Sequence, residues 1–281
     1  MIEPTTATEH LMYSTVRIVG IDANGATYKT GTGFFYQFPV APGDNRNVPI
    51  LVTNKHVIDG VTHADFVIHT NAAGGKKPDG IHNVRSQPAD WIPHPDAKVD
   101  LCAVPVGAVL NQTKAFFRSI DASIVPSQAN LEGLSAVEEI LMVGYPNGLW
   151  DAVNNYPLIR RGITASHPAI AFDVDGVATT VIDAACFPGS SGSPVLLNNE
   201  GAYSDKKGNT IVGNRTLFWG VLFSGPVIQA DGKIVIRNIP TAVQPIAQVN
   251  MMMNLGYIVK ARELASLTAA VLAKIGPISP P

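Results

Sequence analysis

Short apolar runs, separated by Gly, Pro, Asn and Asp, recur along most of this 281-residue sequence. Runs of this length between turn-forming residues are typical of β-strands. The sequence therefore predicts an all-β protein. A less regular stretch divides the runs into two sets, which we expect to form two antiparallel barrels. The sets are 14–22, 31–38, 49–53, 64–70 and 99–106, then 137–145, 157–165, 169–173, 177–185, 193–197 and 216–224.

The C-terminal stretch has a different periodicity. In an Ala-rich segment, apolar side chains recur at helical spacing, at Leu264, Leu267, Val271, Leu272 and Ile275. This spacing predicts a final α-helix. We expect the helix to pack against the second barrel, and the alternative is a helix used for self-association or partner docking. The predicted organisation is an N-terminal extension with the first barrel over 1–118, the second barrel over 119–245, and a helical extension over 246–281.

Composition and charge exclude several classes of protein. With 46% hydrophobic and 15% charged residues, the chain can bury a large core. The net charge is −2, and the basic pairs Lys76-Lys77 and Arg160-Arg161 are isolated, so a nucleic-acid surface is not expected. No apolar stretch is long enough to span a membrane, and residues 1–15 do not resemble a secretory signal. Because Cys102 and Cys186 lack the companions of a disulfide framework, we expect a reducing cytoplasm.

The most informative segment is Gly189-Ser190-Ser191-Gly192-Ser193-Pro194, which lies between the apolar runs 181–185 and 195–197. A serine hydroxyl attacks a carbonyl when a base takes its proton and backbone N–H groups hold the oxyanion, and a Gly-rich turn can supply those donors. The same composition is also common in ordinary hairpin turns. By itself, the segment therefore leaves both interpretations open.

Two upstream segments favour catalysis. The apolar run 49–53 leads to His56, a candidate base, and Asp100 opens the next apolar run, where its carboxylate could orient the imidazole. Asp90 and Asp96 are alternatives for that role, but only Asp100 directly precedes a strand. Together with Ser191, these residues follow the chain order His, Asp, Ser. That order is typical of chymotrypsin-like enzymes and differs from the order in subtilisins and α/β-hydrolases.

These residues resemble those of the trypsin-like (chymotrypsin-fold) serine peptidases, in the bacterial style of the high-temperature-requirement proteases. The resemblance covers residues 12–245 and includes Gly31-Thr32-Gly33-Phe34, Thr53-Asn54-Lys55-His56-Val57, Asp100-Leu101, Val143-Gly144-Tyr145-Pro146-Asn147-Gly148 and Arg160-Arg161-Gly162. It implies two six-stranded Greek-key barrels with the active site between them. It also implies catalytic residues His56, Asp100 and Ser191, with an oxyanion hole formed by the N–H groups of Gly189 and Ser191.

The sequence departs from the trypsins in ways that bear on control. In trypsins the residue before the nucleophile is an aspartate that pairs with a new N-terminal amine, whereas this chain has Ser190. Arg17-Ile18-Val19-Gly20 resembles an activation site, but it lies in an alternating apolar run, so we expect it to be the first strand. Activation by that ion pair is therefore not expected. The residues after 245 are too few for a PDZ domain, so none is predicted.

The resemblance also suggests where substrate binds. It places Ala185 at the floor of the specificity pocket with Cys186 nearby, and it makes Phe223, Ser224 and Gly225 the pocket wall and the edge that pairs with an extended peptide. A small or apolar uncharged residue is therefore expected before the cleaved bond. No metal-ligand spacing occurs, so no metal or other cofactor is expected. The alternative function is a latent or catalytically silent protease-fold scaffold that binds a partner.

Overall fold

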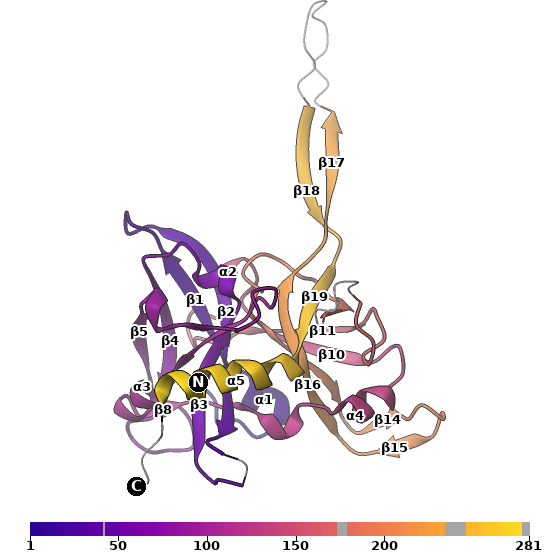
Figure 1. Ribbon diagram of the computed structural model, residues 1–281, viewed down its shortest axis with the longest axis horizontal. Coiled ribbons are helices and arrows are strands. Elements are labelled where there is room, and N and C mark those ends of the chain that lie inside the picture. The colour runs from indigo at the N-terminus through magenta and orange to yellow at the C-terminus, as the bar shows by residue number, and fades with distance from the viewer. Residues whose placement is uncertain (42, 173–178, 234–245, 277–281) are drawn as a thin grey trace, which may run out of the picture.

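The computed structural model describes residues 1–41, 43–172, 179–233 and 246–276. Strands dominate it, and a single long helix lies near the C-terminus (Figure 1). The predicted all-β class with a C-terminal helix is therefore confirmed.

The first half of the chain forms one large sheet. Its main path is β5-β4-β1-β2-β3-β7-β6, with β8 paired to β4 and β9 paired to β2. The expected six-stranded first barrel thus takes the form of a nine-stranded sheet with β5 and β6 at the ends of its path. The short β6 contains Pro93, which has no N–H to donate to a further strand. The strands are β1 (Thr15–Ile21), β2 (Thr27–Pro39), β3 (Asn47–Thr53), β4 (His63–Thr70), β5 (Gly80–Ser86), β6 (Ile92–Pro93), β7 (Cys102–Pro105), β8 (Ala115–Phe116) and β9 (Ile120–Asp121).

The second half forms a closed barrel, as predicted, in the order β10-β11-β12-β19-β16-β13. Its strands pair antiparallel, and alternate side chains fill an interior that includes Met142, Ile182, Val195 and Ile258. The strands are β10 (Glu139–Gly144), β11 (Leu158–Thr164), β12 (Thr179–Asp183), β13 (Pro194–Asn199), β16 (Arg215–Ser224) and β19 (Leu255–Lys260).

Strand β19 corrects the predicted domain limits. It belongs to the segment assigned to a helical extension, yet it pairs with both β12 and β16 and closes the barrel. The predicted boundary at residue 245 lies outside the described residues. Between β16 and β19, strands β17 (Val227–Lys233) and β18 (Ile246–Met252) form an antiparallel ribbon that stands out from the rest of the molecule (Figure 1). A smaller hairpin joins β14 (Ala202–Ser204) to β15 (Thr210–Val212).

The helices are mostly short and connect strands. None of the helices in the described part of the chain is long and apolar enough to cross a membrane. The α-helices are α1 (Ala7–Leu11), α2 (Lys55–Ile58), α3 (Gly107–Gln112), α4 (Gln128–Glu132) and α5 (Leu264–Ile275), and the 3₁₀-helices are η1 (Pro88–Asp90), η2 (Ala122–Ile124), η3 (Pro146–Gly148) and η4 (Ala261–Glu263).

Helix α5 packs against other strands than those expected from the sequence. It lies against β6 and β7 of the first sheet, although it was expected against the second barrel. Its buried side chains Leu264, Leu267 and Val271 join a core cluster that contains residues of both halves. At the end of the helix, Lys274 Nζ donates to the Ala89 carbonyl at 3.1 Å. The helix therefore ties the last described segment of the chain to the first half.

Candidate active site

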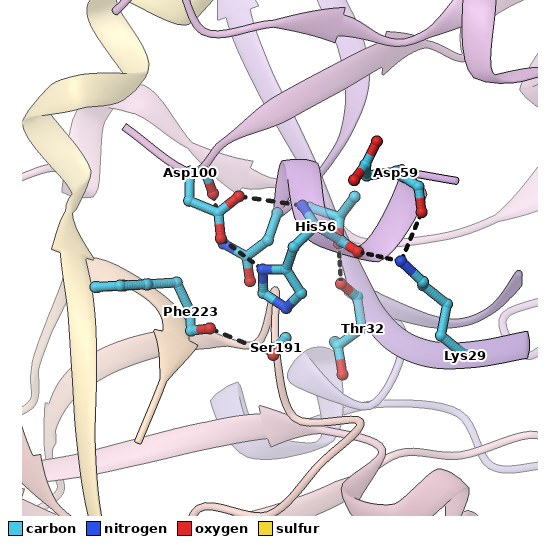
Figure 2. Close-up of polar contacts among 9 residues, drawn as sticks. Lys29, Thr32, His56, Asp59, Asp100, Ser191 and Phe223 are labelled. Carbon is cyan, nitrogen blue, oxygen red and sulfur yellow. Dashed lines mark hydrogen bonds and ion pairs between the residues drawn. The ribbon is translucent and has the colours of Figure 1, made fainter. Parts of the chain in front are cut away.

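His56 is placed by the junction between β3 and α2. Asn54 is the N-cap of this short helix, and its buried side-chain amide donates to the Asp100 carbonyl at 2.7 Å. On the other side, Lys29 Nζ donates to the carbonyls of His56 at 2.9 Å and Asp59 at 2.5 Å. The two bonds from Lys29 satisfy carbonyls in and directly after a one-turn helix that has few hydrogen bonds of its own. The backbone that carries the imidazole is therefore anchored from two sides, by Asn54 and by Lys29. Figure 2 shows the bonds from Lys29.

Asp100 holds the imidazole of His56. Its Oδ2 lies 2.5 Å from His56 Nδ1, and its Oδ1 accepts the backbone N–H of His56 at 3.2 Å. Because an ionised carboxylate only accepts hydrogen bonds, Nδ1 carries the proton and Nε2 is left with a lone pair. The two other aspartates considered from the sequence are engaged elsewhere, since Asp90 accepts the N–H of Gln87 and Asp96 that of Lys98.

Ser191 lies on the loop between β12 and β13, and the imidazole of His56 lies between Asp100 and Ser191 (Figure 2). The three residues come from both halves of the chain, so the site forms where the halves meet. In this structure the Ser191 hydroxyl donates to the Phe223 carbonyl at 3.5 Å. That contact is long and weak. In enzymes without bound substrate, hydrogen bonds between catalytic groups are often long and tighten only when substrate binds.

The loop before Ser191 is fixed by hydrogen bonds to its carbonyls. The Asn147 N–H donates to the Pro188 carbonyl at 2.5 Å, and the Thr32 hydroxyl donates to the Gly189 carbonyl at 3.0 Å. A trans peptide is planar, so its N–H and C=O point in opposite directions. The Gly189 N–H is therefore directed away from Asn147, because it belongs to the same peptide as the Pro188 carbonyl.

The next two carbonyls are held in the same manner. The Ser193 N–H donates to the Ser190 carbonyl at 2.9 Å, and the Thr32 N–H donates to the Ser191 carbonyl at 2.8 Å. The first bond turns the Ser191 N–H away from Ser193 by the same peptide geometry. Within the described parts of the chain, no group accepts a hydrogen bond from the N–H of Gly189 or Ser191. Two backbone donors, separated by Ser190, are thus left without an acceptor among the described residues, in the segment that leads to the Ser191 hydroxyl.

Glycine is required at two positions of this loop. Gly189 and Gly192 have φ values of 85° and 87°, in the left-handed region that other residues adopt at a cost. A Cβ on Gly189 would lie 2.6 Å from the Tyr145 carbonyl oxygen, and one on Gly192 would overlap the Thr32 carbonyl. The close approach of Thr32 and Tyr145 therefore depends on the absence of side chains here.

The predicted specificity residues also lie together. Ala185 is half-buried and Cys186 buried, and a Cβ on Gly225 would lie 3.8 Å from Cys186 Cβ. Burial raises the pKa of the Cys186 thiol to about 11, so it is neutral at pH 7. Phe223 sits at a bulge of β16, between Leu222, which pairs with Ile258, and the exposed Ser224, which pairs with Tyr257.

Sequence reasoning missed several residues that hold the loop. Thr32 and Asn147 lie in motifs that carry the family resemblance, but the spacing of these motifs along the chain does not predict their hydrogen bonds to the loop. In the sequence Arg160 stands out only as part of an isolated basic pair and of a family motif, whereas in the structure its Nη2 donates to the buried Ser190 hydroxyl at 2.5 Å. The prediction about Ile18 is confirmed, because it is buried in β1 and pairs with Gly31 and Phe66.

Comparison with known families decides the assignment. The family model of the trypsin-like peptidase domain matches residues 31–203, which are 173 of the 281 residues. The chain belongs to the trypsin-like peptidase family. It is accordingly a serine protease, and the resemblance seen in its motifs is confirmed at the level of this family.

The chain was also compared with curated protein sequences and with solved structures. A comparison with curated protein sequences found no match. Among solved structures, the trypsin-like peptidase is similar to the crystal structure of the Rv3671c protease from M. tuberculosis in its active form. The two share 19% sequence identity with a TM-score of 0.48, over 96% of this chain and 84% of that chain.

Proposed function

We propose that the protein is a serine endopeptidase in which Ser191 is the nucleophile, His56 the general base and acid, and Asp100 the residue that orients His56. The observation that carries this proposal is the imidazole of His56 held by Asp100 on one side and lying over Ser191 on the other (Figure 2). Because His56 Nδ1 donates to Asp100, Nε2 is left free to accept a proton from the Ser191 hydroxyl.

In the proposed reaction, Ser191 Oγ bonds to the carbonyl carbon of the peptide while its proton moves to His56 Nε2. The carbonyl π electrons move to the oxygen and form an oxyanion. When the intermediate collapses, the C–N bond breaks and the leaving amine takes the proton from His56. Water then repeats the sequence on the acyl-enzyme, with His56 as base, and releases the acid product and Ser191.

The N–H groups of Gly189 and Ser191 are the proposed oxyanion donors. The hydrogen bonds to the carbonyls of Pro188, Gly189 and Ser190 support this role, because they hold the loop before substrate arrives. Preorganised donors need no reorientation during the reaction, and loss of one such donor costs about 100- to 1000-fold in kcat in other proteases. We therefore propose that the uncut chain is active.

The neighbouring side chains support an uncharged substrate residue before the cleaved bond. Ala185, the neutral Cys186 and Gly225 offer no charge to pair with. Beside them, the ring of Tyr257 lies 6.3 Å from that of Phe223 and 6.0 Å from that of Phe172. We propose that an extended peptide pairs with residues 223–225 and that its upstream side chains contact this aromatic row.

A reducing location such as the cytoplasm is a further part of the proposal. Cys102 and Cys186 are both free and buried. Burial raises the pKa of both thiols, which keeps them protonated and unreactive at neutral pH. Neither cysteine therefore needs an oxidising environment for the fold.

The test uses the purified, uncut protein with a fluorophosphonate probe and a proteome-derived peptide library, and Ser191→Ala as control. We expect labelling of Ser191 and cuts after small or apolar residues, both absent from the control. Cuts after Arg or Lys would contradict the proposed pocket. Labelling and cleavage that are absent from both proteins would instead support the alternative of a protease-fold scaffold.

A further inference from the structure

Arg160 lies on strand β11, and its side chain reaches residues 187–191, the segment that we call the nucleophile loop. It is half-buried, whereas its neighbour Arg161 is exposed and forms an ion pair with Glu139 at 2.5 Å. Successive residues of a strand point to opposite faces, which explains the different surroundings of these two arginines. The sequence shows a pair of like residues, but the structure gives them separate roles.

The guanidinium of Arg160 makes a single hydrogen bond within the described chain. Its Nη2 donates to the Ser190 hydroxyl at 2.5 Å, while Nε and Nη1 are buried without a partner. Its Cζ also lies 5.9 Å from the centre of the Phe187 ring. Burial lowers the pKa of this guanidinium, so the charge is held at a cost in stability. The hydrogen bond and the ring contact both go to the segment 187–190, and Cys186, which also interacts with this guanidinium, directly precedes that segment.

Ser190 separates the two backbone donors of the proposed oxyanion hole. Its side chain is fully buried, its N–H donates to the Phe187 carbonyl at 3.0 Å, and its carbonyl accepts the Ser193 N–H at 2.9 Å. The bond from Arg160 adds an anchor to the side chain. A shift of Ser190 would directly move the Ser190–Ser191 peptide, which carries the Ser191 N–H. Through Gly189 it would also displace the preceding Pro188–Gly189 peptide, which carries the Gly189 N–H.

We propose that Arg160 is a positioning residue that holds the nucleophile loop, with its proposed oxyanion donors, in the catalytic conformation through the Ser190 hydroxyl. This inference rests on the proposed function of Ser191 and its loop. Arg160 does not touch the substrate, and its anchor comes from inside the folded chain. The loop therefore needs no newly formed N-terminal amine for its support.

The test compares Arg160→Met with Arg161→Met, which changes the adjacent arginine on the opposite face. We expect Arg160→Met to lower kcat by about 10- to 100-fold with little change in KM, because misplacement of a catalytic group by about 1 Å has effects of this size. Since a buried unpaired charge is removed, the melting temperature should stay the same or rise. Arg161→Met should remain within about twofold of the unaltered enzyme. Equal kcat values for the two variants would overturn the proposal.

A double-mutant cycle with Ser190→Ala identifies the route of the effect. If Arg160 acts through the Ser190 hydroxyl, the double variant Arg160→Met with Ser190→Ala should be no slower than the slower single variant. Multiplied losses would show that the two residues act independently and would overturn the proposed route.

Hydrogen–deuterium exchange of peptides spanning residues 187–193 separates this inference from the proposed function. We expect faster exchange in Arg160→Met than in Arg161→Met, whether or not the protein cleaves peptides. If the unaltered protein is not labelled by the fluorophosphonate and cleaves nothing, the proposed function fails while exchange still measures the anchor. Unchanged exchange in Arg160→Met would overturn the inference even for an active enzyme.

Discussion

Asp100 accepts two hydrogen bonds from His56, one from the ring at Nδ1 and one from the backbone N–H, at 2.5 and 3.2 Å. The first sets the tautomer of the imidazole and the second fixes the carboxylate relative to the helix that carries it. Asp100 therefore sets both the protonated nitrogen and the orientation of the His56 imidazole.

Asp100→Asn should abolish most of the activity without unfolding the protein. An amide that donates to Nδ1 favours the tautomer with its proton on Nε2, which cannot accept from Ser191. We expect kcat to fall by about 10⁴-fold, as in the related substitution in other Ser-His-Asp enzymes. Steady-state kinetics would measure this, with Asp96→Asn as the control. Comparable losses in both variants would count against the assignment of Asp100.

Thr32→Val should affect both stability and turnover. The hydroxyl of Thr32 donates to the Gly189 carbonyl at 3.0 Å and accepts the Tyr145 N–H at 3.1 Å, and the residue is fully buried. Its loss leaves buried polar groups unpaired, which costs about 1–3 kcal/mol in the free energy of unfolding. Thr32→Ser keeps the hydroxyl and should restore activity. Urea denaturation and kcat would be measured for both, and equal losses would show that the methyl group matters instead.

Gly189→Ala should disrupt the proposed oxyanion hole. Gly208 is a suitable control, since its φ of 84° is close to the 85° of Gly189 and a Cβ added there would meet no atom within 4 Å beyond the adjoining residues. Alanine at 208 should cost only the backbone strain, about 1–2 kcal/mol, with unchanged kcat. Alanine at 189 adds a clash with the Tyr145 carbonyl and should lower kcat sharply. Similar kcat values for the two variants would refute the requirement for close approach.

Lys260 should make stability depend on pH. It is only 2% exposed, Nζ donates to the Ile170 carbonyl at 2.8 Å, and burial lowers its pKa from 10.5 to about 8. Between these pH values the unfolded chain binds a proton at Lys260 that the folded chain has released. The free energy of unfolding should therefore rise from pH 8 to pH 10.5 in the unaltered protein relative to Lys260→Met. Thermal denaturation at several pH values would measure this difference, and a constant difference would contradict it.

The residues of the candidate site could be picked out from the sequence because each lies in a local pattern. A histidine after an apolar strand, an aspartate before one and a serine in a Gly-rich turn are each visible in a few residues. Their order along the chain then favours one family. The sequence also indicated a tight turn at Gly189 and Gly192, because the backbone conformation of a turn depends on local residues.

The anchors of the site were not accessible in this way. Asn147, Thr32 and Arg160 reach the nucleophile loop from other strands and turns, and nothing in their spacing predicts these contacts. The partners of β19 and α5 were equally hidden. A short apolar strand can pair with the edges of many other strands, and an amphipathic helix can cover many different apolar faces. The partner that each takes is therefore decided by the packing of the folded chain.

The sequence by itself thus determined the class of the fold and the type of chemistry, and it singled out the candidate catalytic residues, because short-range patterns encode strands and turns. Only the tertiary structure decided that β19 closes the second barrel, that α5 lies on the first sheet, and that Arg160 bonds to Ser190 while Arg161 pairs with Glu139. These outcomes depend on contacts between residues far apart in the chain, which are selected by the packing of the whole molecule.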